Sequence, residues 1–150
     1  MPLRAVDLNY PLLCLTRHMG ICLARSAPEF ERCRAAVFWH GRFFEGLRVV
    51  DASGQTHEIV RVSIRRPATR LGQRLARLLE LPISVQTEAE TTAAVSVAEV
   101  RRVIEQAIHD DAESFEEFSG KDVAWWRESV EACRSVPDLM RMLLSLQADG

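Results

Sequence analysis

The feature that most constrains this fold is a pair of apolar segments, Phe43–Asp51 and Gln55–Arg65, separated by a short stretch rich in turn-forming residues. Asp, Ser and Gly in that stretch favour a tight turn, and the glycine can take the left-handed conformation of a bulged hairpin. In the second segment Val60, Val62 and Ile64 recur at every second position, so they are expected on the core face of a strand. The residues between them, most of which this pattern places outside, are Ile59, Arg61, Ser63 and Arg65. The sequence therefore predicts an antiparallel hairpin.

More strands are expected on both sides of this hairpin. Residues 11–17 and 19–25 are apolar enough to pair as strands around a turn at 18–20. A Ser-led capping box then predicts a short helix over 26–34. Residues 82–88 again have the composition of a strand.

Residues 69–80 have a helical period with two distinct faces. The leucines on one face are Leu71, Leu75, Leu78 and Leu79, and the arginines on the other are Arg70, Arg74 and Arg77. We expect the arginine face to be solvated or to pair with acidic residues. Binding of phosphate or RNA is a further alternative, although no aromatic residues lie between the arginines to stack on bases. The patch for it would consist of Arg61, Arg65, Arg66, Arg70, Arg74 and Arg77.

The C-terminal part of the sequence reads as helical. Capping residues at Ser96, Asp122 and Ser135 predict three helices, with an acidic connector over 110–120 between the first two. Trp126 is expected in the core and Trp125 partly exposed. Strands first and helices last predict an α+β fold, an antiparallel sheet with a central β-hairpin covered by C-terminal helices, in a single domain over residues 1–150.

The charge is unevenly distributed along the chain. Residues 1–80 hold 13 arginines against 7 acidic residues, whereas residues 81–150 hold 6 basic residues against 14 acidic ones. The formal net charge of −2 excludes nucleic-acid binding through bulk charge. We find no leader or membrane-spanning pattern and no paired cysteine motif. We therefore expect a cytoplasmic protein with buried free thiols and no membrane partner.

Known catalytic motifs are absent from the sequence, so we expect no catalytic residues, no metal and no cofactor. The interpretation we favour is a non-catalytic domain, monomer or homodimer, that binds another protein through its acidic helices. The expected contact residues are Glu113, Glu116, Glu117, Trp125 and Glu128. The alternative is a small-ligand binder or enzyme with a Cys/His site among the strands, formed by Cys14, His40 and His57.

Several short motifs resemble those of small uncharacterised cytoplasmic bacterial proteins, some of which look like immunity partners of toxins. The motifs are Tyr10–Leu12, Ser26–Phe30, Phe43–Leu47, Val50–Gly54, Trp126 and Ser135–Leu139. This resemblance implies protein binding without catalysis. A basic toxin, such as a nuclease, is then the expected partner of the acidic surface.

Overall fold

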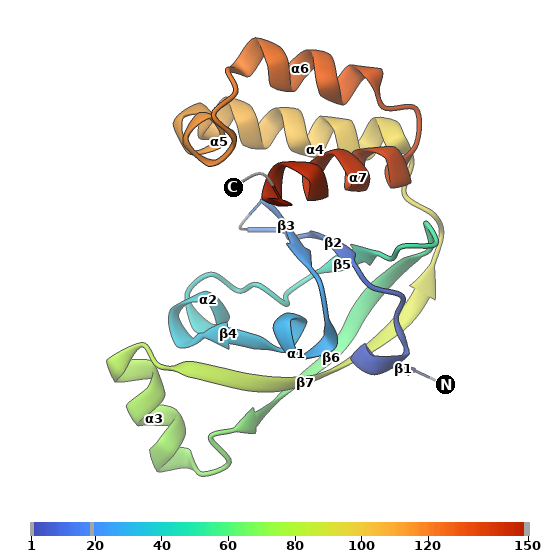
Figure 1. The fold of residues 1–150 in the computed structure, drawn as a ribbon. Helices are drawn as coiled ribbons and strands as arrows, with labels where there is room; N and C mark the ends of the chain where they lie inside the picture. The colour runs from blue at the N-terminus through green and yellow to red at the C-terminus, as the bar shows by residue number, and fades with distance from the viewer. Residues whose placement is uncertain (1, 19, 149–150) are drawn as a thin grey trace. The chain divides into compact units, whose positions relative to one another are not determined.

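The computed structural model describes residues 2–18 and 20–148, so Met19 of the expected turn lies outside the described residues. Figure 1 labels the elements. They group into two compact units, residues 1–93 and 94–150, and each unit is described by itself. Among the described residues the strands lie in the first unit, and the second unit is helical. The prediction of an α+β fold with an antiparallel sheet is confirmed, whereas a single domain over residues 1–150 stays a prediction.

The first unit is built on one antiparallel sheet in the order β1-β7-β6-β5-β2-β3, with β4 paired to part of β7. Its strands are β1 Leu3–Arg4, β2 Leu12–Leu15, β3 Ile21–Ala24, β4 Arg32–Arg34, β5 Arg48–Val50, β6 Thr56–Arg66 and β7 Pro82–Thr92. Figure 1 shows β6 and β7 as a long curved ribbon with α3 at one end. Side chains from several strands fill the core of this unit, among them Leu12, Val49, Ile83 and Val85.

The hairpin predicted from the sequence is formed by β5 and β6, and Gly54 in its turn has φ 88°. The expected inside–outside pattern holds for Val62 and Ile64, which pack against the core. It is wrong at Val60, which is 48% exposed, while Ile59 is buried instead. The cause is a shift in the β6–β7 register between Ile59 and Arg61, because one extra residue in a strand reverses the alternation.

Asp51 joins the hairpin turn to the sheet. One carboxylate oxygen, Oδ1, accepts hydrogen bonds from the Ser53 amide at 2.9 Å, the Ser53 hydroxyl at 2.6 Å and the Gln55 amide at 3.0 Å. The other oxygen, Oδ2, lies 3.0 Å from Nε2 of His57 in β6. The second ring nitrogen of His57 lies 3.1 Å from the Thr91 hydroxyl of β7. The turn, β6 and β7 are therefore connected by one polar chain, in which Asp51 and His57 are buried and Thr91 is exposed.

Short helices connect the strands of the first unit: η1 Ala5–Asp7, α1 Ala27–Phe30, α2 Ala35–Trp39 and α3 Arg70–Leu79. Ser26 caps α1 by accepting a hydrogen bond from the Glu29 amide at 3.3 Å, as predicted. The helix is shorter than the expected span of 26–34, because β4 begins at Arg32 and pairs with β7.

The second unit consists of α4 Val97–Asp110, α5 Ala112–Ser119, α6 Val123–Ala132 and α7 Val136–Ala148. The expected connector over 110–120 is in fact helix α5, because Asp111 caps its first turn and Gly120, at φ 68°, ends it. Trp126 is buried as predicted, with its indole N–H donating to Ser119 Oγ at 2.9 Å and its ring edge-on to Phe115. Across residues 2–18 and 20–148, no helix has the length and apolar character that a membrane crossing requires.

We expect Asp51→Ala to lower the free energy of unfolding by about 2–4 kcal/mol, because it leaves two backbone amides and a buried imidazole without their acceptor. Urea unfolding followed by circular dichroism measures this. The matched control is Glu58→Gln, which changes an exposed carboxylate beside His57. Equal midpoints for the two variants would contradict the role given to Asp51.

The same carboxylate predicts a dependence of stability on pH. Burial acts to raise the pKa of Asp51, but the hydrogen bonds from Ser53, His57 and Gln55 outweigh it and hold the pKa below its ordinary value. The contribution is therefore present above the unfolded-state pKa of about 4 and is lost as the pH falls through the lower folded-state value. In the Asp51→Asn variant, the free energy of unfolding is expected to fall less steeply as the pH is lowered from neutral to acidic values. An unchanged pH dependence of the free energy of unfolding would show that other carboxylates cause it.

Candidate partner-binding surface

Helix α3 takes the place of a tight turn between the two longest strands, and both of its ends are fixed by hydrogen bonds. At the N-terminus the Thr69 hydroxyl accepts from the Gly72 amide at 3.0 Å, and the Gln73 side chain donates to the Pro67 carbonyl at 3.0 Å. At the C-terminus Glu80 adopts the left-handed conformation that ends many helices. The helix is therefore held firmly between β6 and β7.

The side of α3 that packs against the first unit is made of small residues. Ala76 is 1% exposed, and a Cβ built on Gly72 would lie 2.8 Å from the Pro67 Cβ. Beside these contacts, the Arg77 guanidinium lies 5.7 Å from the centre of the Trp39 ring of α2. Small residues allow close approach of the helix, so its large side chains point elsewhere.

The leucines of α3 point into solvent. We call Leu71, Leu75, Leu78 and Leu79 the leucine face; they are exposed by 69%, 46%, 77% and 61% respectively. An amphipathic helix normally buries such a face. In α3 the packed side is instead the one carrying Ala76 and Gly72, and all four leucines remain exposed.

The arginines of α3 lie at the border of the leucine face. Arg70, Arg74 and Arg77 are all exposed, as the sequence predicted. With Gln73 and Trp39 they line a shallow hollow of about 200 Å³. The helix contains no acidic residue. The surface therefore combines exposed apolar area with positive charge, a combination found in protein-interaction sites.

The acidic residues expected to contact a partner lie on two helices of the second unit. Glu113, Glu116 and Glu117 are exposed on α5, and Glu128 is exposed on α6. Trp125 is half-buried, edge-on to Trp126, with the Lys121 ammonium 5.7 Å from its ring centre. The residues are accessible to a partner, while their role stays a prediction.

The three residues of the alternative site have different surroundings. Cys14 is buried in β2 and its thiol is hydrogen-bonded to Cys22. His57 is buried between Asp51 and Thr91, whereas His40 is exposed at the end of α2. None of the hydrogen bonds found for these three residues joins one of them to another. In the part of the chain that the structure describes, no three His, Cys, Asp or Glu side chains are grouped to hold a metal ion.

The expectation of buried cysteines is correct for Cys14 and Cys133, but Cys33 is half-buried and Cys22 is exposed. Neither the exposure of Cys22 nor that of the leucine face could be read from residue type. Both depend on which side of an element packs against its neighbours. The available signal for α3 was the pair of small residues, Gly72 and Ala76, at i and i+4 on one side of the helix.

We predict that Gly72→Ala destabilises α3. Alanine normally favours a helix by about 1 kcal/mol over glycine, but here the new methyl group would overlap the rigid Pro67 ring and the Thr69 cap. Hydrogen exchange of the α3 amides should become faster, while Leu75→Ala, at an exposed position of the same helix, should leave it nearly unchanged. Slower exchange in Gly72→Ala would refute this account of the contact.

No protein-family model, no curated protein and no solved structure matches this chain, so the surface is interpreted from its own residues.

Proposed function

We propose that this chain is a protein-binding domain whose leucine face on α3 docks into an apolar groove, bordered by carboxylates, on a partner protein. The observation that carries the proposal is the exposure of four leucines on one ordered helix, each by 46% or more. Scattered exposed leucines are ordinary, whereas a contiguous exposed apolar patch marks an interaction site.

The spacing of the leucines favours a helix-binding groove. Leu71, Leu75 and Leu78 recur at i, i+4 and i+7, the positions at which amphipathic helices anchor in grooves of other proteins. These three leucines fit a protein groove, whereas Leu79 widens the face towards the breadth with which helices lie on a membrane surface, so the vesicle experiment below separates the two. A protein is therefore the partner that the spacing supports.

The arginines beside the leucine face support a partner whose groove is bordered by carboxylates. Burying one fully exposed leucine contributes about 1.5–3 kcal/mol. The four leucines are already partly buried, so together they contribute about 4–8 kcal/mol against an association cost of about 4–15 kcal/mol. Leucine burial alone therefore gives weak binding or none. Arg70 and Arg74 border the face, and carboxylates opposite them would add affinity and choose the partner.

A basic partner is the second candidate, and the accessible carboxylates of α5 and α6 favour it. In this version the domain neutralises a basic toxin, as an immunity protein does. Glu113, Glu116 and Glu117 would steer the toxin, and Trp125 would provide an apolar anchor. The two candidates differ in which set of residues binding requires.

The decisive experiment compares matched variants in affinity purification from cells that encode the protein. Leu71→Asp/Leu78→Asp should abolish recovery of the partner, because it places charges in the apolar contact. The matched control is Val6→Asp, since Val6 is 74% exposed but lies on η1. Equal loss with Val6→Asp, or retention with the leucine variant, would exclude the leucine face.

Charge reversal separates the candidates further. Arg70→Glu/Arg74→Glu should lower the affinity for an acidic partner at least tenfold at low salt, and by less at high salt. If Glu113→Lys/Glu116→Lys/Glu117→Lys loses the partner instead, the basic-partner hypothesis is the right one. A last measurement is sedimentation of the protein with vesicles of anionic phospholipid. If the protein binds the vesicles and this binding requires Leu71 and Leu78, the leucine face binds a membrane surface and not a protein.

A further inference from the structure

Two cysteines face each other across the β2–β3 hairpin. Cys14 pairs directly with Cys22 in the register of the two strands. The Thr16 amide donates to the Gly20 carbonyl at 3.0 Å, which marks 16 and 20 as a hydrogen-bonded pair. Two residues further along, 14 and 22 form the next such pair, for which the Cα separation is about 5.5 Å. Disulfides span Cα separations of about 4.4–6.8 Å, so the Cα atoms of this pair lie within that range. Closing the bond requires the two Cβ atoms to move somewhat closer together, because a hydrogen-bonded pair holds them about 5.5 Å apart.

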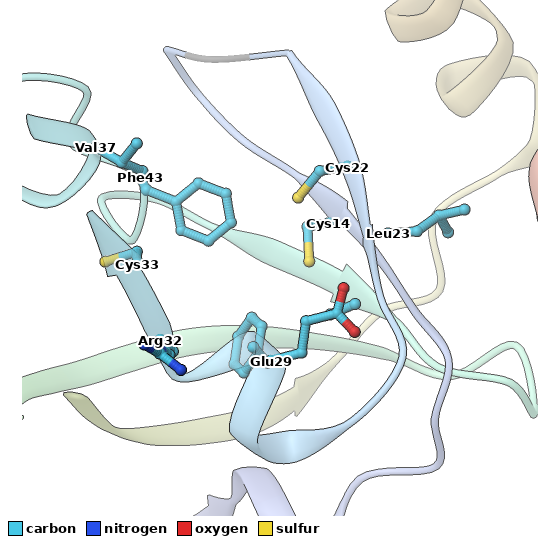
Figure 2. A pocket seen from close by; sticks show the side chains of 10 residues that line it. Cys14, Cys22, Leu23, Glu29, Arg32, Cys33, Val37 and Phe43 are labelled. Carbon is cyan, nitrogen blue, oxygen red and sulfur yellow. The ribbon is translucent and has the colours of Figure 1, made fainter. Parts of the chain in front are cut away.

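The two thiols are in contact and differ in accessibility. They are hydrogen-bonded to each other, and both side chains line the same pocket, drawn in Figure 2. Cys14 is 0% exposed, whereas Cys22 is exposed. An external reagent can therefore reach Cys22 first.

The hydrogen bond also separates the chemical roles of the two thiols. It lowers the pKa of Cys22 more than burial raises it. The same bond, together with burial, raises the pKa of Cys14. Thiolates are the attacking species in disulfide exchange, so Cys22 is the nucleophile and Cys14 is a buried thiol in contact with it.

The pocket has room for one half of a small organic disulfide. Its volume is about 210 Å³, about seven times the volume that a water molecule occupies in the liquid. Phe30, Val37 and Phe43 give it apolar walls, and the side chains of Glu29 and Arg32 also line it. Figure 2 labels Glu29, Arg32, Val37 and Phe43 together with the cysteines of this pocket.

We propose that Cys14 and Cys22 are a thiol–disulfide exchange site, oxidised by a low-molecular-weight disulfide to a bond across the β2–β3 hairpin. The Cys22 thiolate attacks one sulfur of the small disulfide, forms a mixed disulfide and releases one thiolate. Cys14 then gives up its proton and attacks the Cys22 sulfur, which releases the second half as a thiolate. One small disulfide and two protein thiols thus give one protein disulfide and two small thiols, a transfer of two electrons.

Cys33 lines the same pocket but takes no part in this exchange. It lies on β4, opposite Ile83 of β7, and not on the hairpin. Burial raises the pKa of Cys33 to about 11, so it stays a thiol near neutral pH. Cys33→Ser is therefore a matched control from within the pocket.

The test treats the reduced full-length chain with oxidised glutathione near neutral pH. Intact-mass spectrometry of the wild type should show loss of two hydrogens, with at most a transient glutathione adduct, and peptide mapping should join Cys14 to Cys22. Cys14→Ser should accumulate glutathione on Cys22, Cys22→Ser should not react at either position, and Cys33→Ser should behave as the wild type does.

A stable glutathione adduct on wild-type Cys22, or a disulfide to any other cysteine, would overturn the proposal. No reaction of the wild type would overturn it as well. Because the wild-type time course alone distinguishes these results, the test holds even if a cysteine variant fails to fold. It needs no protein partner, so its outcome is independent of the proposed binding function.

Discussion

The first unit depends on the pairing of two eleven-residue strands, β6 and β7. β5 continues the sheet from β6, while β1 and β4 pair with opposite ends of β7. The Asp51–His57–Thr91 chain fixes one end of this ladder, and α3 closes the other. The long β6–β7 pairing, with the Asp51–His57–Thr91 hydrogen bonds at one end, therefore positions both the core side chains and the proposed binding helix.

Much of this architecture was predictable, because periodicity and capping residues report on local structure. The β5–β6 hairpin, the Ser26 and Ser96 caps and buried Trp126 all follow from local rules. The bulge after Ile59 did not follow, since it is a property of the pairing with β7 and not of β6 alone. α5 was missed because its acidic composition resembles a solvated connector, although Asp111 is an ordinary signal for the start of a helix and Gly120 for its end.

The candidate sites were less predictable, because a functional surface depends on what does not pack. The two faces of α3 were visible as a pattern, but the pattern could not say that Ala76 and Gly72 would take the packed side. Likewise, the sequence predicted strands that contain Cys14 and Cys22, yet only the register places the two opposite each other. A register one residue different would have put their side chains on opposite faces of the sheet.

The attachment of α3 at both ends has a consequence for recognition. A free peptide with this sequence would be a marginal helix in water, since ten residues are too few to repay nucleation. Here the strands on either side and the Thr69 and Glu80 ends keep it folded before any encounter. The loss of backbone freedom has therefore already occurred during folding, so a partner of the proposed kind would meet an already folded helix and would be selected by the shape of its groove.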